Sequence, residues 1–350
     1  MMNKNRSFWL GMDRKFFLVE EDMPVLGDHD VLIKPMANSI CGSELRTYTT
    51  GFMGKRSMDE PCTVGHECSG IITEVGKKVS NLHVGQHVVI EPGIYCQHCA
   101  NCTSGRYNIC DDFYFTASND YHNFGKAKGG HGEGAMRDFL AVPEHMLHVI
   151  PDDMDFDVAA LAEPTAVAVH AVRRAGDLRG KDVAIFGAGP IGMLVMQCAL
   201  ASGAGTVTMI DISAARLKLA TERGASAVIQ SGATEIPSYA FDVLFEVTGI
   251  ATVQNQMVYA AKRGSTLVQV GWPGKDAVID IYEFNWKELT YNGSIDYAGD
   301  FPTAIRWLAD GRVDGKAMIT HRFKFEEIPE AFELAATKPD ECIKAVIIHE

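Results

Sequence analysis

The sequence predicts an α/β protein with two domains, a β-rich domain and a doubly wound domain built on a parallel sheet. Three observations predict this. The chain has 350 residues, more than a single hydrophobic core usually organises. Its hydrophobic pattern changes near residue 155, from short β-like runs to an alternation of strands and helices. In the second part, a glycine pattern typical of dinucleotide binding follows a predicted strand.

The first part reads as an irregular all-β domain. From Phe8 to Val149, short apolar runs are separated by glycine, proline and polar clusters, as in folds with many short strands. The clearest runs are VLIK, GIITEV, HVVIEP and HMLHVI.

From Asp157 onward, predicted strands and helices alternate. The predicted strands are DVAIFG, TVTMID, FDVLFEV and STLVQVG, and helical stretches such as PIGMLVMQCALAS and SAARLKLATERG lie between them. Strands that are apolar throughout indicate a parallel sheet covered by helices on both faces.

Composition and charge argue against a membrane protein, a secreted protein and a nucleic-acid-binding protein. No stretch approaches 18 apolar residues and charges interrupt the N-terminal region, so we expect neither a membrane span nor a secretory leader. The formal net charge of -13 has the wrong sign for binding nucleic acid. The nine cysteines are an odd number and lack disulfide-like spacing, which favours free thiols or metal ligands. We therefore expect a cytoplasmic protein.

Four cysteines lie within one short loop. Cys96, Cys99, Cys102 and Cys110 are separated by two, two and seven residues, a spacing that lets one loop surround a tetrahedral metal ion. Zinc with four thiolate ligands leaves no position for substrate, so this site is predicted to be structural. The alternatives are ordinary buried or disulfide-bonded cysteines, or a zinc ribbon for nucleic acid. The intervening TSGRYNI carries a single Arg, which argues against the ribbon.

The glycine pattern predicts a nicotinamide dinucleotide. Gly187 permits a tight turn, Gly189 lets the backbone approach the pyrophosphate, and Gly192 lets helix and strand pack closely. Asp211 ends the next strand, where a carboxylate accepts hydrogen bonds from ribose hydroxyls and repels a 2'-phosphate, so NAD is favoured over NADP. Arg216 is the counter-argument, since it lies near enough to meet a phosphate. The alternative is a glycine turn that only packs a helix.

The expected cofactor-binding residues comprise the glycine turn, the second strand with its following helix, and the ends of two later strands. They are Gly187, Gly189, Pro190, Ile191, Gly192, Asp211, Arg216, Val247 and Val270.

A second metal site is predicted in the β-rich part. Cys41, His66, Glu67 and Glu163 are each unremarkable alone, since a lone His or Glu is more often a surface or core group. Together with a structural zinc loop and a dinucleotide fold, they suggest an open zinc site with a position left for water or a substrate oxygen.

The chain resembles the zinc-dependent medium-chain dehydrogenases, and within them the sorbitol or polyol dehydrogenase branch. The resemblance spans essentially the whole chain. The segments that carry it are ICGSELRTY, VGHECSG, IEPGIYCQHCANCTSGRYNIC, LAEPTAVAVHA, FGAGPIGM, DISAARLKLA, SIDYAGDFPTAI and ITHRF. It implies a GroES-like catalytic domain of residues 1–155 and 299–350, a Rossmann domain of residues 156–298, two zinc ions per chain and a homo-oligomer, commonly a tetramer or otherwise a dimer.

The resemblance also implies residue roles. Cys41, His66 and Glu163 bind or border the catalytic zinc, and Glu67 is a ligand that exchanges with substrate or water. Ser43 starts proton removal from the alcohol. Zinc acts as a Lewis acid that lets an alkoxide form near neutral pH, and the alkoxide gives its hydride to NAD.

The chain departs from the polyol branch near the substrate pocket. It has Arg46-Thr47 where that branch usually has His then Tyr, and Asp296 where it has Arg, and its segment 119–132 looks longer. A carboxylate in place of an arginine should disfavour anionic substrates, although Arg46 offsets this if it points into the same pocket. The alternative is that Asp296 turns to solvent. The expected pocket residues are Arg46, Thr47, Phe115, Ser118, Asp296 and Tyr297.

Three functions remain open on the sequence alone. The first is NAD-dependent oxidation of a secondary alcohol of a polyol, cyclitol or amino-polyol to a ketose or ketone. The second is a threonine-dehydrogenase-like amino-alcohol dehydrogenase. The third is a nucleotide-binding structural or sensing protein on the same scaffold, which the loss of zinc ligands would signal; every expected ligand is present.

Overall fold

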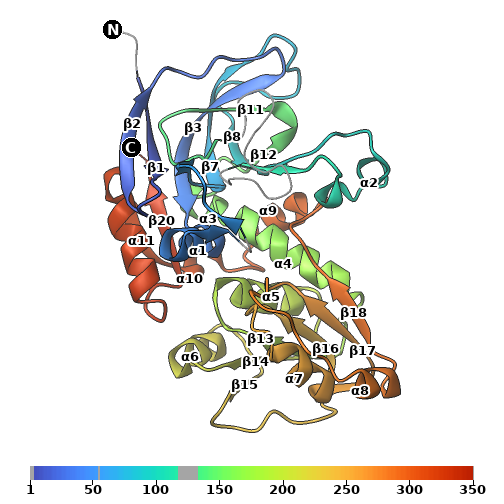
Figure 1. Ribbon diagram of the computed structural model, residues 1–350. Helices are drawn as coiled ribbons and strands as arrows, with labels where there is room; N and C mark the ends of the chain where they lie inside the picture. The colour runs from blue at the N-terminus through green and yellow to red at the C-terminus, as the bar shows by residue number, and fades with distance from the viewer. Residues whose placement is uncertain (1–3, 54–55, 117–132, 350) are drawn as a thin grey trace. The chain divides into compact units, whose positions relative to one another are not determined.

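The computed structural model describes residues 4–53, 56–116 and 133–349 (Figure 1). The chain divides into two compact units. The first comprises residues up to 163 together with 304–309 and 315–350, and the second comprises 164–303 with 310–314. The first unit therefore uses both ends of the chain. The bounds expected from the sequence, 155/156 and 298/299, differ from these by several residues.

A seven-stranded sheet dominates the first unit. Its order is β12-β8-β7-β3-β20-β19, and β11 also pairs with β3. The strands are β3 (Asp30–Ser39), β7 (Glu67–Val75), β8 (His87–Ile90), β11 (Leu140–Pro143), β12 (Leu147–Val149), β19 (Ile319–Lys324) and β20 (Lys344–Ile348). The four apolar runs singled out in the sequence form β3, β7, β8 and β12. The C-terminal β20 lies beside β3 (Figure 1).

Smaller elements complete the first unit. β1 (Asn5–Leu10), β2 (Phe16–Glu21) and β6 (Cys62–Thr63) form a three-stranded sheet, and two short hairpin-like pairs join β4 (Phe52–Met53) to β5 (Arg56–Ser57) and β9 (Gly93–Ile94) to β10 (Tyr114–Phe115). The helices are α1 (Gly42–Thr50), α2 (Ala100–Thr103), α3 (Phe156–Ala159), α10 (Gly315–Met318) and α11 (Ile328–Thr337). Short 3-10 turns cover Tyr107–Ile109, Glu144–Met146 and Phe325–Glu327. Phe332 of α11 is fully buried against Phe16, with ring centroids 4.7 Å apart.

The second unit is a six-stranded parallel sheet in the order β15-β14-β13-β16-β17-β18. Its strands are β13 (Asp182–Phe186), β14 (Thr206–Asp211), β15 (Ala227–Gln230), β16 (Phe241–Glu246), β17 (Ala261–Gln269) and β18 (Thr290–Gly293). Its helices are α5 (Pro190–Ala201), α6 (Ala214–Glu222), α7 (Val253–Ala260) and α8 (Ile281–Trp286). Two helices, α4 (Ala162–Ala175) and α9 (Phe301–Ala309), cross the boundary between units.

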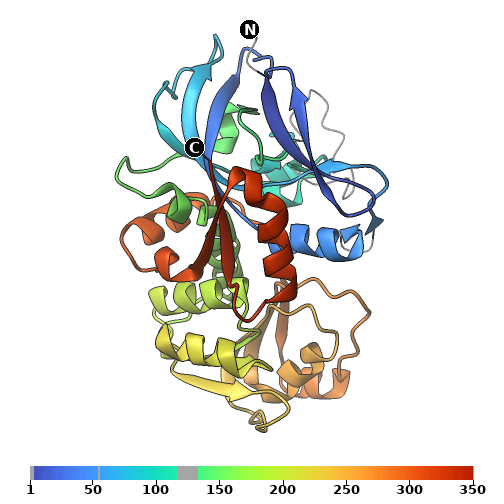
Figure 2. The same ribbon diagram turned by 90° about the vertical axis from the view of Figure 1, so that its left-hand side faces the viewer.

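The strand order explains why helices cover both faces. The chain winds outward from β13 to β15 and then returns to continue on the other side of β13. Since such crossovers are right-handed, α5 and α6 cover one face and α7 covers the other (Figure 2). The direction reverses between β13 and β16, the place where open α/β sheets bind ligands.

The expected two-part α/β fold is confirmed, with two edge strands added. β15 and β18 flank the sheet, and neither is among the apolar runs that the sequence pattern singles out. β18 has the sequence TYNG with both ends exposed, so it carries none of the buried apolar character that marks the central strands. In the part of the chain that the structure describes, no helix has the length and apolar character needed to cross a membrane.

The turn after β13 is tightly packed. Gly187 has φ +110°, a conformation that L side chains rarely adopt. A Cβ added at Gly192 would collide with the carbonyl oxygen of Gly187 and lie 3.1 Å from a methyl of Val247. The first turn of α5 therefore packs directly on the glycine turn and on the end of β16, and leaves no room for a side chain at Gly192.

We expect Gly192→Ala to destabilise the second unit by about 1–3 kcal/mol, since the added methyl must push α5 away from the turn. Gly293→Ala is the matched control, because no atom of the described residues, its chain neighbours apart, lies within 4 Å of a Cβ at that position. Urea unfolding of both variants measures the difference, and dinucleotide binding should weaken only in Gly192→Ala. Equal stability of the two variants would contradict the close packing inferred here.

Candidate active site

Strand pairing brings the mixed group of ligands together in the first unit. In the antiparallel pair of β3 and β7, Ser39 lies opposite Glu67. Cys41 follows β3 by two residues and His66 precedes β7 by one, so both lie at the same end of this pair. The ligand atoms of Cys41, His66 and Glu67 lie within 4.8 Å of one another. A soft sulfur, an imidazole and a carboxylate at this separation fit a zinc ion with room for one more ligand.

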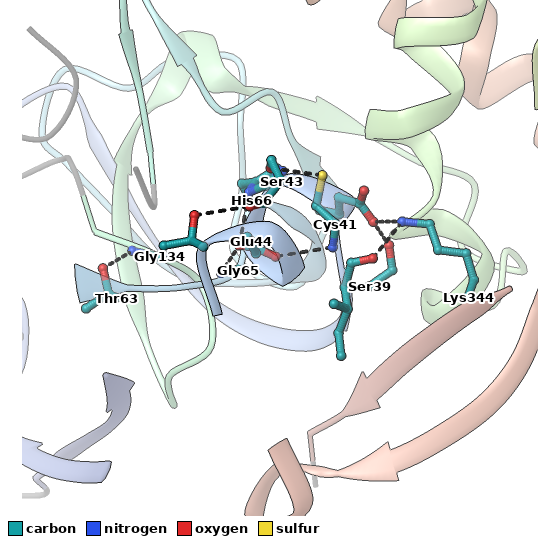
Figure 3. A network of polar contacts seen from close by, with 12 residues as sticks. Ser39, Cys41, Ser43, Glu44, Thr63, Gly65, His66, Gly134 and Lys344 are labelled. Atoms are coloured by element: carbon teal, nitrogen blue, oxygen red, sulfur yellow. Dashed lines mark hydrogen bonds and ion pairs between the residues drawn. The ribbon is translucent and has the colours of Figure 1, made fainter. Parts of the chain in front are cut away.

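Glu44 fixes the orientation of His66. It lies in the first turn of α1 and is almost fully buried. Its Oε1 accepts hydrogen bonds from the backbone N–H of Gly65 at 2.6 Å and from His66 Nδ1 at 3.0 Å (Figure 3). Its Oε2 accepts one from the backbone N–H of Cys41 at 3.2 Å. A carboxylate on Nδ1 leaves Nε2 of His66 for the metal, as in many zinc sites.

The charges of this pair support each other. Burial lowers the pKa of His66, but the Glu44 carboxylate and the Cys41 sulfur outweigh it and raise that pKa well above its ordinary value. Burial raises the pKa of Glu44, but His66 outweighs it and the net pKa of Glu44 is lowered. The sequence pattern does not single out Glu44. Its signal there is an acidic residue at the third position of a helix, typical of N-terminal capping.

A buried lysine stands behind Glu67. Lys344 Nζ and Ser39 Oγ both donate to Oε2 of Glu67, and Lys344 also donates to the carbonyl of Ile40 at 3.0 Å (Figure 3). Burial lowers the pKa of Lys344, but the charges of Glu67, Cys41 and Glu163 outweigh it and raise that pKa. The sequence pattern gives no signal for Lys344, because β20 reaches this site only through its pairing with β3.

Ser43 and Glu163 are also expected at the metal site, and Phe115 is expected in the substrate pocket. Ser43 is exposed, and its hydroxyl donates to Cys41 Sγ at 3.2 Å. Glu163 is buried in the first turn of α4 and does not belong to the group of ligand atoms within 4.8 Å. Phe115 lies against His66, with ring centroids 5.1 Å apart.

The remaining residues expected in the substrate pocket belong to both units. Arg46 is half-buried on α1, three residues after Ser43 and therefore on the same helix face. Thr47 is buried, and its hydroxyl donates to the carbonyl of Ser43 at 3.1 Å within the helix. Asp296, with φ +46°, and Tyr297, buried against Phe301, belong to the second unit. Ser118 and the segment 119–132 lie outside the described residues.

The four-cysteine loop has the geometry of a closed zinc site. All four sulfurs lie within 4.8 Å of one another, and the pairs Cys96–Cys102 and Cys99–Cys110 are each 3.9 Å apart. A zinc–thiolate tetrahedron with bonds of about 2.3 Å has edges of about 3.8 Å. Backbone N–H groups also point at the sulfurs, and the hydrogen bond from Cys102 lowers the pKa of Cys99 to about 6. None of the nine cysteines is in a disulfide.

The expected dinucleotide residues gather at the carboxyl edge of the second sheet. Asp211 Oδ2 accepts a hydrogen bond from the backbone N–H of Ala188 at 2.6 Å, so this carboxylate is fixed beside the glycine turn. Apart from the chain neighbours of Gly189, the helix N-cap, the one atom of the described residues within 4 Å of a Cβ placed there is Nη1 of Arg216, at 4.0 Å. This leaves the backbone at Gly189 accessible to a ligand.

The other residues of this set flank the turn. Pro190 opens α5 and Ile191 follows it. Val247 and Val270 directly follow β16 and β17, where Val247 donates to the carbonyl of Phe186 at 3.0 Å and Val270 to that of Glu246 at 2.8 Å. Glu246 is fully buried and accepts hydrogen bonds from Thr248, Gly249 and Gln269. The sequence pattern does not single out Glu246, which connects the loops after these two strands.

Comparisons with known proteins agree with this geometry. The family model described as alcohol dehydrogenase GroES-like domain matches residues 27–152, and the model described as zinc-binding dehydrogenase matches residues 190–310. The chain is 33% identical to sorbitol dehydrogenase of Bacillus subtilis (strain 168) over 334 residues, which are 93% of this chain and 92% of that protein. The chain belongs to the zinc-containing alcohol dehydrogenase family.

Other members of the family show the same coverage. D-xylulose reductase A of Aspergillus oryzae is 32% identical over 343 residues, which are 94% of this chain and 93% of that protein. The solved structure of L-idonate 5-dehydrogenase from Escherichia coli K-12 has a TM-score of 0.89 at 30% identity and covers 99% of each chain. As a zinc-type alcohol dehydrogenase, the chain carries a structural zinc site at Cys96, Cys99, Cys102 and Cys110, a catalytic site at Cys41, His66 and Glu67, and a site for a nicotinamide cofactor.

The two metal sites should differ in lability. We expect purified protein to hold up to two zinc ions per chain, one for each group of ligands. A chelator should remove the ion of the open site, with its carboxylate ligand, before that of the four-thiolate site, and activity should fall with the first loss. Elemental analysis during timed chelation measures both. Metal-free protein that is fully active would refute the zinc assignment.

Glu44→Gln should weaken zinc binding at the open site by about 10–100-fold, since the histidine ligand loses its charged partner. Glu74→Gln, on the exposed part of β7, is the control and should leave metal affinity unchanged. Competition with a chelator of known affinity measures both variants. If Glu44→Gln binds zinc as tightly as the parent, Glu44 does not support the ligand His66.

Proposed function

We propose that this protein is an NAD-dependent zinc dehydrogenase that oxidises a secondary alcohol of a neutral polyol to a ketone. The observation that carries the proposal is the open group of Cys41, His66 and Glu67, in which Glu44 orients the histidine. Such a group fits an enzyme rather than a structural or sensing protein, which has no need of an exchangeable ligand position.

Each residue has a definable task in this reaction. A zinc ion held by Cys41 and His66 supplies Lewis acidity toward the alcohol oxygen, and NAD accepts the hydride. Ser43 lies beside Cys41 with an exposed hydroxyl, so it can take the alcohol proton and pass it to solvent. Phe115 packs on His66 and so provides an apolar surface beside this ligand.

The preference for NAD rests on Asp211. Its carboxylate is fixed beside Ala188, where it would meet the 2'-hydroxyl side of an adenosine ribose and repel a phosphate. Arg216, close to Gly189, provides the opposing positive charge. We infer that the carboxylate dominates, because it is hydrogen-bonded in place at the end of β14.

Asp211→Asn and Asp211→Ser should reduce the preference for NAD over NADP, because both remove the charge that repels a 2'-phosphate. Steady-state kcat/KM with each dinucleotide measures the preference. Asp242→Asn, a carboxylate at the start of β16, is the control. Equal use of NAD and NADP by the parent would overturn the assignment.

Two charged residues bear on the charge of the substrate. Sorbitol and xylulose, named for two of the relatives, are neutral, whereas L-idonate carries a carboxylate. Asp296 supports a neutral or cationic substrate, because a carboxylate repels an anion in a partly desolvated pocket. Arg46 supports an anionic one, since it shares a helix face with Ser43.

A substrate panel decides between these charges. We expect kcat/KM to be highest for a neutral polyol, lower for an aldonate or a polyol phosphate, and to shift toward the anions in Asp296→Arg. Arg46→Gln should have little effect on a neutral polyol. If an aldonate or a sugar-alcohol phosphate is the best substrate of the parent and Arg46→Gln abolishes this, Arg46 sets the specificity. An amino alcohol as the best substrate would indicate the threonine-dehydrogenase-like alternative.

We also infer a homo-oligomer in a reducing compartment such as the cytoplasm. The absence of disulfides among the nine cysteines supports a reducing compartment.

An exposed apolar surface supports the homo-oligomer. It consists of Ile281, Tyr282 and Trp286 on α8 and of Val278 next to them, and we infer that a second copy of the chain binds at this face of the second unit.

A further inference from the structure

Lys344 is a buried cation beside Glu67, where its positive charge opposes the binding of a zinc ion. Lys344 and Glu67 are exposed by only 3% and 1%. A buried ion pair contributes little net stability compared with apolar residues of similar volume. Stability alone therefore does not explain an ammonium placed against the carboxylate of a metal ligand.

The hydrogen bonds show how Lys344 acts on Glu67. Both Lys344 Nζ and Ser39 Oγ donate to the same oxygen, Oε2. A carboxylate oxygen that accepts two donors, one of them charged, is a weaker electron donor to a metal. Glu67 would have to give up both bonds to bind zinc firmly through Oε2, and through Oε1 it would offer zinc a carboxylate whose charge the two donors draw toward Oε2.

The charges of the site favour an ammonium beside Glu67. With zinc bound, the Cys41 thiolate, Glu44, Glu67 and Glu163 would contribute four negative charges, and zinc with Lys344 three positive ones. Lys344 is fixed in this position by its bond to the carbonyl of Ile40, the residue before Cys41. The ammonium is thus held against Glu67 and also interacts with the charge of the Cys41 sulfur.

We propose that Lys344, assisted by Ser39, is a positioning residue that competes with the metal for Glu67 and so keeps this carboxylate displaceable by the alcohol. The inference rests on the catalytic metal site of the proposed function. Lys344 itself touches neither substrate nor cofactor in this role.

The proposal predicts the direction in which zinc affinity changes. Lys344→Met removes the competitor, so Glu67 should bind the metal more firmly and zinc affinity of the open site should rise by about tenfold, a change of the size that outer partners produce. Turnover should fall, because Glu67 no longer yields to the alcohol. Lys344→Arg, which keeps the charge, should restore both values toward the parent. A merely structural role predicts the opposite, a looser metal site.

A double-mutant cycle isolates Glu67 as the target. In a Glu67→Gln background, Lys344→Met should no longer raise zinc affinity, because the displaceable carboxylate is gone. Persistence of the full increase would mean that Lys344 only repels the metal through space, and would overturn the proposal. Lys287→Met is the matched control, since Lys287 is a fully buried lysine in the second unit.

Cobalt replacement gives a readout independent of turnover. With Co²⁺ in the open site, the visible ligand-field bands report coordination number, and an inert alcohol should displace Glu67 and change these bands in the parent but not in Lys344→Met. Identical responses would overturn the proposal. If Lys344→Met does not fold, Ser39→Ala tests the same oxygen and should raise zinc affinity by a smaller factor; no rise there refutes the inference.

These measurements separate the inference from the proposed function. Zinc affinity and cobalt spectra need no substrate, so a parent that binds zinc but oxidises no polyol would refute the function and leave the competition testable. A parent that binds no metal at Cys41 and His66 would refute both.

Discussion

The antiparallel register of β3 with β7 and β20 is the constraint on which the catalytic site depends. Ser39 lies opposite Glu67 of β7 and opposite Val346 of β20, so three segments far apart in the sequence end at one place. The pairing of β3 with β7 places Cys41 and His66 at this point, and the pairing of β3 with β20 places Lys344 there. A slip of one residue in either strand would turn these side chains to the other face of the sheet.

Around this point, ionic groups are buried together rather than singly. Glu44 faces His66 and Lys344 faces Glu67, so these charged groups are paired, and Glu44 and Lys344 also make hydrogen bonds to backbone groups. Isolated buried charges are too costly to persist, but paired ones specify geometry. The result is a site whose ligands are oriented by buried partners, with the carboxylate of Glu67 bonded to Lys344. In the second unit, the expected cofactor site depends on two other features. Gly192 packs closely against the turn after β13, and the side chain of Glu246 accepts hydrogen bonds that fix the loops after β16 and β17.

Features coded by neighbouring residues could be predicted from the sequence. All four ligands lie in the single loop from Cys96 to Cys110, so the spacing of the cysteines alone indicates a metal site. The glycine turn and its strand and helix are equally local, and the central strands are apolar throughout. The edge strands β15 and β18 escaped this pattern, because an edge strand is only half-buried and needs no continuous apolar run.

What only the tertiary structure decided is which distant side chains meet. Glu67 and Lys344 are 277 residues apart, and their contact follows from strand pairing that no local pattern encodes. The same holds for Glu163, which the structure leaves outside the compact group of Cys41, His66 and Glu67. The sequence by itself determined the two-part fold, the metal, the class of cofactor and the ligand types, because these depend on residue chemistry and short spacing. The partners that tune those ligands depend on register and burial, which exist only once the chain has folded.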